Sequence, residues 1–156
     1  MNQDIYVIAE HLQGQVMEIT YVMLAAARRL AGKTGGDVVA ILLGHNAQKL
    51  ADDFAADRVL YLDHPALAEF TPDAYLTTLS DLIANKKPRA VLMGHTSVGM
   101  DVASGLSVRL ELPLVSQCLD SGSAHGTQTF ISQICGGKIM AEGEIPDKTL
   151  LVTLCL

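Results

Sequence analysis

Short runs rich in valine, isoleucine and leucine recur along residues 5–116 of the chain. A strand that is covered on both faces of a parallel sheet needs apolar side chains on both sides, so its sequence is nearly continuous in apolar residues. The pattern therefore predicts five strands of one parallel sheet. They are Ile5–Ala9, Val38–Leu43, Val59–Leu62, Ala90–Met93 and Leu114–Ser116.

Apolar residues at helical spacing fill several of the intervals between these strands. The first predicted helix spans Ile19 to Leu30 and ends in a glycine-rich segment at residues 32–36. The second has Thr71 as its N-cap and Pro72 at its first helical position, and the third covers residues 97–110. Strands that alternate with helices are typical of α/β proteins, so we expect a three-layer, Rossmann-like domain.

After residue 117 the strand patterns follow one another without a helical pattern between them. A turn-rich stretch, DSGSAHGTQ, precedes them, and a Gly-Gly pair and a turn around Pro146 and Asp147 join them. We therefore expect about three additional, mostly antiparallel strands at one side of the parallel sheet, with residues 1–156 forming a single domain. These strands are Thr129–Ile134, Lys138–Glu142 and Thr149–Leu154.

The acidic composition excludes several classes of partner. A formal net charge of -6 leaves no basic surface for a phosphate backbone, and aromatic residues for stacking bases make up only 4% of the chain. We therefore expect no nucleic acid partner. No apolar run approaches the roughly 18 residues of a membrane span, and the first residues lack a signal-peptide pattern. We expect no membrane insertion and a cytoplasmic location.

Three cysteines, Cys118, Cys135 and Cys155, lie in or beside apolar runs. Their odd number and the absence of a C-x-x-C spacing argue against a disulfide framework or a zinc site. We expect reduced cysteines that pack as small buried hydrophobic residues.

The stretch GHTSVGMD, residues 94–101, lies where the fourth predicted strand passes into a helix. Ligands of doubly wound sheets bind at the carboxyl ends of the strands, where backbone amides at a helix start can receive a phosphate. The sequence therefore predicts a nucleotide-binding edge for AMP or ATP. Its candidate residues are Gly94, Thr96, Ser97, Gly99 and Asp101.

The same stretch fits an ordinary helix start. Thr96 or Ser97 would cap the helix, and Gly99 would permit close packing. Asp101 would complement the positive end of the helix dipole. Every helix needs a cap, and the glycine spacing lacks the lysine of a phosphate-binding loop, so the helix-start interpretation is favoured.

Three histidines form a second candidate site. His11, His45 and His95 each follow the carboxyl end of a predicted strand, and they would be neighbours if the strand order were 3-2-1-4-5. Three imidazoles can hold a metal ion. No two of them have the local spacing of a known metal motif, so we favour no metal and keep this set as the lesser alternative.

No catalytic set is recognisable. The chain has neither a G-x-S-x-G nucleophile elbow nor an H-E-x-x-H zinc motif. We therefore expect no catalytic activity from the chain on its own.

Four longer segments follow one another in an order that carries a family resemblance. They are IYVIAEHLQGQV, AADRVLYLDHPALAEFTPDAYLTTLSDLI, KPRAVLMGHTSVGMDVASGLSVRLELPLVSQ and FISQICGGKIMAEG. This succession resembles the N-terminal domain of the electron transfer flavoprotein alpha subunit. The resemblance implies a fold of the adenine nucleotide alpha hydrolase-like superfamily, with parallel strand order 3-2-1-4-5 and three further strands.

The resemblance also implies a function. The alpha and beta subunits of the family pair, and a flavin held mainly by the C-terminal domain of alpha accepts electrons from dehydrogenases. The N-terminal domain is largely a scaffold that contacts beta. On this basis we expect the FAD-binding domain to be absent from these residues and no cofactor in this chain alone. FAD would be present in the complete complex with an electron transfer flavoprotein beta subunit.

The chain departs from the family's pattern near both candidate turns. Met100 stands where family members tend to have an arginine, and Ser104-Gly105 stands where they tend to have a Pro-Arg pair. The loss of two arginines removes positive charge that would meet a flavin phosphate or an acidic partner. Near the hairpin, an Arg, a Pro and a Tyr are replaced by Ser132, Gln133 and Cys135. The positions that match are Gly94, Thr96, Gly99, Asp101, Arg109, Gly136, Gly137 and Lys138.

Two other functions stay open beside this scaffold. One is a stand-alone adenine-nucleotide-binding module of universal stress type, which would use the edge described above. The other is an enzyme of the hydrolase branch, which the missing catalytic set makes the weakest of the three. The apolar stretch LLVTLCL suggests that something packs beside it, and an exposed strand edge there would favour a homodimer or a further domain.

Overall fold

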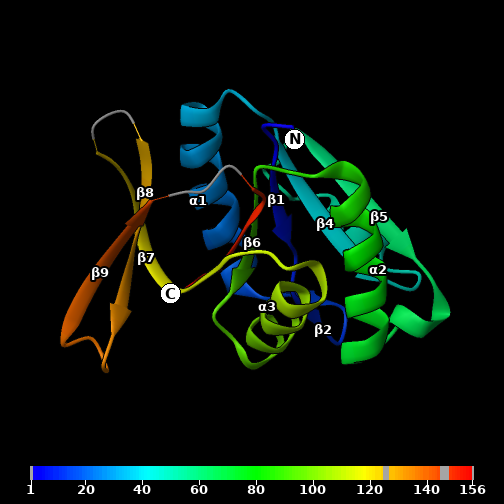
Figure 1. The fold of residues 1–156 in the computed structure, drawn as a ribbon. Coiled ribbons are helices and arrows are strands. Elements are labelled where there is room, and N and C mark those ends of the chain that lie inside the picture. Colours follow the sequence, from blue (N-terminus) through cyan, green and yellow to red (C-terminus); the bar gives the residue numbers. More distant parts are fainter. Residues whose placement is uncertain (1, 125–126, 145–147, 156) are drawn as a thin grey trace.

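Parallel strands covered on both faces form the centre of the molecule (Figure 1). The computed structural model describes residues 2–124, 127–144 and 148–155. The larger strands are β1 (Ile5–Ile8), β4 (Val38–Gly44), β5 (Arg58–Asp63), β6 (Ala90–Gly94), β7 (Leu114–Ala124), β8 (Thr127–Ile134), β9 (Ile139–Glu144) and β10 (Leu150–Leu154). The other elements are the short strands β2 (His11–Leu12) and β3 (Gln15–Val16), the helices α1 (Glu18–Thr34), α2 (Pro72–Lys86) and α3 (Ser97–Leu110), and the 3-10 turns η1 (Gln48–Ala51) and η2 (Pro65–Leu67).

The first four parallel strands have the expected arrangement. Within the described residues, the main sheet has the order β5-β4-β1-β6-β10-β7-β8-β9. In this sheet Ile5 of β1 lies opposite Val38 of β4 and Ala90 of β6, and all three residues are buried. The α/β class predicted from the apolar runs is therefore confirmed.

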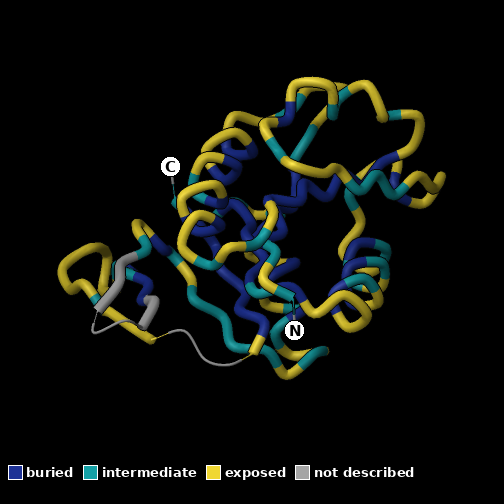
Figure 2. Tube along the Cα trace, turned by 90° about the horizontal axis from the view of Figure 1, so that it is seen from above, coloured by how far each residue is buried: buried dark blue, intermediate teal, exposed yellow. Residues whose placement is uncertain are grey.

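Alternation along each strand divides the core between the two faces of the sheet. One face packs against α1, where Val7 and Leu92 meet Met23. The other face packs against α2 and α3, where Val91 and Ile41 belong to the same cluster as residues of both helices. These two clusters give the three layers, and Figure 2 shows the buried strands running through the middle of the molecule.

The strand at Leu150–Leu154 corrects our prediction. We expected it to be antiparallel and at one side, but it lies inside the sheet and runs parallel to both β6 and β7. All five of its residues are buried, as its nearly continuous apolar sequence requires. The excursion of the chain through β8 and β9 supplies the crossover that a helix usually provides between parallel strands. The fifth position in the order belongs to β10 instead of β7.

The strands β7, β8 and β9 form an antiparallel arm at one end of the sheet, beside α1, and β9 lies at its outer edge (Figure 1). The predicted short strand at Leu114–Ser116 continues to Ala124, so the turn-rich stretch lies largely in β7 and β8. Cross-strand pairing of the backbone, as between Ser121 and Phe130, favours extension there despite the turn residues. The predicted turn at Pro146 and Asp147 lies outside the described residues.

The helix boundaries follow from local conformations. Helix α1 continues through Gly32 and ends where Gly35 adopts a left-handed conformation with a φ of 77°. Thr71 and Pro72 begin α2 as expected, although the Thr71 side chain makes no capping hydrogen bond. None of the helices in the described part of the chain has the length and apolar character needed to cross a membrane.

We expect Thr153→Val to destabilise the domain because it removes the hydroxyl that β10 shares with its neighbours. Thr153 is 1% exposed, and its Oγ1 accepts a hydrogen bond from the backbone N–H of Gln117 at 3.2 Å. It also lies 3.0 Å from the ring Nδ1 of His95. The unpaired N–H should cost about 1 to 2 kcal/mol in the free energy of unfolding, measured by urea denaturation. Thr153→Ser keeps the hydroxyl, so its free energy of unfolding should fall by less. An equal fall in both variants would contradict the prediction.

Candidate functional site

The loop between β6 and α3 is held by one side chain at the start of the helix. Thr96 is the N-cap of α3, and its Oγ1 accepts a hydrogen bond from the backbone N–H of Gly99 at 3.0 Å. A methyl group placed on Gly99 would overlap the carbonyl oxygen of Gly94. These contacts confirm the capping and close-packing roles that the helix-start interpretation gave to Thr96 and Gly99.

The carboxylate of Glu10 lies at this helix start. Glu10 follows β1, and the hydroxyl of Thr96 donates to its two oxygens, at 3.0 and 2.9 Å. A backbone hydrogen bond from Gly94 reaches the same carboxylate. At Gly94 a methyl group would come within 2.7 Å of Glu10 Oε1, so glycine there makes room for the carboxylate. Glu10 therefore joins the end of β1 to the end of β6 and the beginning of α3.

Burial raises the pKa of the Glu10 carboxyl above its ordinary value, while hydrogen bonds from Thr96 and Gly94 lower it. The carboxylate lies beside the start of α3, close to where helix amides could receive a phosphate. A phosphate placed there would meet a like charge in a partly desolvated site. The structure therefore adds an obstacle to AMP or ATP at this edge, and the nucleotide-binding role of these residues stays a prediction.

The predicted edge residues are distributed unevenly around a cavity. Thr96, Ser97 and Gly99 line it, while Gly94 is buried beside Glu10. Asp101 is exposed on α3 and is not among the residues that line the cavity. The structure thus brings together four of the five predicted residues and leaves Asp101 on the outer surface of the helix.

The cavity has a volume of about 420 Å³ and lies over the carboxyl ends of β1 and β6. A second hollow of about 530 Å³ adjoins it, because both are lined by Leu12, Phe70 and Tyr75. The rings of Phe70 and Tyr75 meet edge to face with their centroids 4.9 Å apart. This arrangement matches the place at which ligands bind in open α/β sheets.

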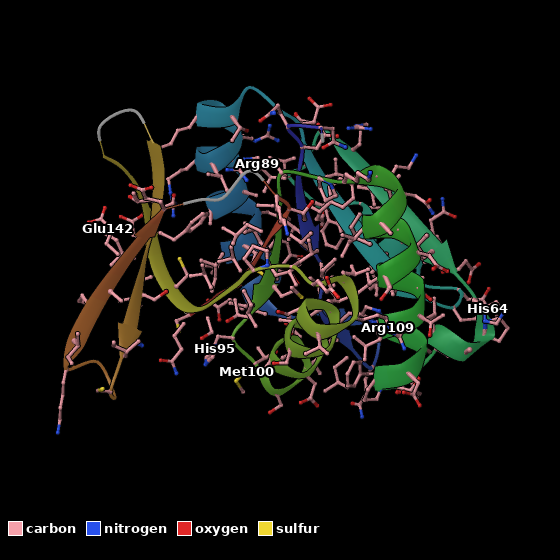
Figure 3. All side chains as sticks on the ribbon, in the orientation of Figure 1. His64, Arg89, His95, Met100, Arg109 and Glu142 are labelled. Atoms are coloured by element: carbon pink, nitrogen blue, oxygen red, sulfur yellow. The ribbon has the colours of Figure 1, made fainter. Side chains whose placement is uncertain are left out.

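The three histidines have separate partners. His11 Nε2 lies 2.7 Å from the carbonyl oxygen of Leu43, and His45 Nδ1 lies 3.0 Å from a carboxylate oxygen of Asp63. His95 is hydrogen-bonded to Thr153 and appears in Figure 3 at the end of the sheet near α3. Across residues 2–124, 127–144 and 148–155, no three His, Cys, Asp or Glu side chains are grouped so that they could hold a metal ion. The structure therefore gives no support to a metal site made by these three histidines.

The cysteines are free thiols in different environments. Cys118 is fully buried, and burial raises the pKa of its thiol to about 11. A thiol with this pKa stays protonated at neutral pH and is a poor nucleophile. Cys155 is half-buried and Cys135 is exposed in the hairpin turn, so the prediction of a buried role is wrong for Cys135.

Glu10 is the residue of this site that sequence reasoning missed. The sequence feature that could have identified it is a single carboxylate between a buried strand and a turn. It lies next to His11, which we considered as a metal ligand instead. The pattern of one strand does not reveal that this carboxylate meets a threonine 86 positions later.

Comparisons with known proteins cover nearly the whole chain. The family model described as an electron transfer flavoprotein domain matches residues 5–155. The chain is 36% identical over 151 residues to the electron transfer flavoprotein subunit alpha of Thermoanaerobacterium thermosaccharolyticum, covering 94% of this chain and 46% of that protein. It is 29% identical over 157 residues to the corresponding subunit of Bacillus subtilis, covering 99% and 48%.

A third relative is an electron transfer subunit of a reductase. The chain is 34% identical over 119 residues to the acryloyl-CoA reductase electron transfer subunit beta of Anaerotignum propionicum, covering 74% of this chain and 32% of that protein. The chain thus spans about half the length of the two alpha-subunit relatives and a third of this one.

We expect Gly99→Ala to be strongly destabilising because the added methyl group meets backbone, which cannot move aside as a flexible side chain can. The loss in unfolding free energy should be about 3 kcal/mol, measured by thermal and urea denaturation. Gly32→Ala is the matched control, since Gly32 lies within α1 with open space around the added methyl. That variant should gain about 0.5 to 1 kcal/mol. Similar effects at both positions would contradict the close approach.

We expect Glu10→Gln to change how stability depends on pH. The pKa of Glu10 is raised in the folded protein, so its contribution to stability is fully present below the unfolded pKa. That contribution is lost as the pH rises through the folded pKa. As the pH is lowered from 7 to 4, the free energy of unfolding of the native protein should therefore rise relative to that of Glu10→Gln. Denaturation at several pH values in that range measures this difference. A constant difference between the two proteins would refute the raised pKa.

Proposed function

Because the chain belongs to the electron transfer flavoprotein domain family, we propose that it is the partner-binding scaffold of an alpha-type subunit. It takes part in electron transfer from flavin-dependent dehydrogenases only together with a beta-type subunit and a flavin domain. The family match over residues 5–155 carries this proposal, and the alpha-subunit relatives align with nearly all of the chain.

The candidate site supports a scaffold more than a flavin site. A flavin dinucleotide carries a pyrophosphate, which would meet the carboxylate of Glu10 at the start of α3. The residues at this edge therefore do not fit FAD. In the proposal, the flavin of the complete complex is held by other parts of the assembly.

The projecting arm is the surface that we assign to the partner. Its outer strand β9 stands at the end of the sheet order, so one backbone edge has no neighbouring strand among the described residues. Large apolar side chains on the arm are exposed to about half of their surface: Leu119 (43%), Ile134 (43%), Ile139 (51%) and Met140 (57%). Exposed apolar residues gathered on one projecting element are typical of a protein interface.

Two charged residues on the same arm indicate which chemical groups the partner surface needs. Glu142 and Glu144 are exposed on β9, and Figure 3 shows Glu142 on the arm, far across the molecule from His64. A partner that covers the apolar residues would need basic or donor groups opposite these two carboxylates. We therefore propose an interface with an apolar centre and an acidic margin.

We expect Ile139→Glu to weaken assembly with the beta-type subunit of the same organism by about tenfold or more, because it places a charge within the apolar centre. The chain and that subunit would be coexpressed, and the complex measured by native mass spectrometry and sedimentation. Val108→Glu is the matched control, since Val108 is 83% exposed on α3, away from the arm.

Because both side chains are exposed in the free chain, neither variant should change its melting temperature by more than about 2 °C. A complex that tolerates Ile139→Glu would overturn the assignment of the arm. A homodimer of the chain that excludes the beta-type subunit would overturn the proposed function itself.

A further inference from the structure

The cavity over β1 and β6 is a feature of the described chain that the scaffold proposal does not use. Its volume of about 420 Å³ falls in the range of small-molecule sites, which begins near 300 Å³. Most of its wall is apolar and comes from the strands and the helices around their carboxyl ends. These apolar residues are Ile8, Ala9, Leu12, Met17, Phe70, Met93, Val98 and Val102.

Glu10 is the acidic group in this wall. Its oxygens accept from Thr96 and from the backbone of Gly94, and an ionised carboxylate can accept about four hydrogen bonds. The cavity wall of the described chain contains no lysine or arginine, and His11 is bonded through Nε2 to the carbonyl oxygen of Leu43. The carboxylate therefore retains acceptor capacity without a cation in the wall to neutralise it.

Two aromatic side chains and a second carboxylate lie near Glu10, where the cavity meets the adjoining hollow. Phe70 and Tyr75 line both hollows, and Glu69 lines the adjoining one. Burial raises the pKa of the Tyr75 hydroxyl, and the charges of Glu10 and Glu69 raise it further. Both carboxylates thus act at the place where the two hollows join, although Lys49 lies on the outer wall of the second. Negative potential and aromatic rings both favour a cation.

We propose that this cavity binds a small organic amine, with its ammonium group at Glu10 and its apolar body against the surrounding side chains. A partly desolvated carboxylate gains a charge-assisted hydrogen bond from an ammonium group, while an anion is repelled. A neutral ligand of the same shape gains only the apolar contact. No residue of the arm is among those that line this cavity in the described chain, so this proposal goes beyond the scaffold function and does not rest on it.

Three ligands with the same ring test the charge preference. Phenethylamine is a cation at pH 7, phenethyl alcohol is neutral, and phenylacetate is an anion. We expect phenethylamine to bind about tenfold more tightly than the alcohol, and phenylacetate to bind more weakly than either, by NMR titration. The amide signals of Gly94 and Gly99 should shift, because both residues adjoin the Glu10 carboxylate. Equal affinity for the three ligands, or no binding of phenethylamine at about 10 mM, would overturn the proposal.

Two variants locate the ammonium group. Glu10→Gln should remove the preference for phenethylamine over the alcohol, whereas Glu111→Gln, at the exposed C-terminal end of α3, should leave it unchanged. Met17→Lys serves if Glu10→Gln fails to fold. Met17 lines the cavity and is 44% exposed, so a lysine there can direct its own ammonium toward the carboxylate without disturbing the core. Its affinity for phenethylamine should fall about tenfold, and unchanged amine binding in both folded variants would overturn the assignment to Glu10.

Discussion

The pairing of β10 with β6 on one side and β7 on the other holds the structure together. Among the described residues β7 has no other parallel neighbour, so backbone pairing joins the arm to the main sheet through β10. Backbone hydrogen bonds extend this pairing at both ends, from His95 N–H to Leu154 at 2.7 Å and from Leu150 N–H to Arg89 at 3.1 Å. Without this strand, β6 would become an edge, and the arm would keep only its contacts with α1, such as the hydrogen bond from Lys33 to the carbonyl oxygen of Ser121.

The same strand connects the arm to the candidate site. Thr153 of β10 contacts Gln117 of β7 and His95, which directly precedes the N-cap of α3. Thr96 in turn donates to Glu10 at the end of β1. A short chain of hydrogen bonds therefore runs from the base of the arm to the cavity. Glu10 is held at both its side chain and its backbone, since its carboxylate accepts from Thr96 and Gly94 while its backbone N–H and carbonyl group are hydrogen-bonded to the Thr20 hydroxyl of α1.

Local patterns predicted the parts of this fold that local energetics determine. The apolar runs identified the strands, and Thr96 with Gly99 identified the helix start, because burial on both faces and capping leave direct marks in the sequence. The position of β10 was not predicted, since a run such as LLVTL shows that a strand is buried but does not identify its neighbours. Glu10 was missed for a related reason, because its partner lies on a distant strand-to-helix loop. The three histidines do follow the carboxyl ends of strands, but each is hydrogen-bonded to a different residue instead of to a shared ligand.

The central place of β10 also has a consequence for synthesis of the protein on the ribosome. Strands β1, β4, β5 and β6 can pair as soon as residue 94 has emerged, because their partners all lie within that length. The position beside β6 must then wait until residue 154 is available. During that interval the apolar edge of β6 has no partner strand on that side, and an exposed edge of this kind is open to pairing with other chains. Slow translation between residues 94 and 154 would prolong that exposure.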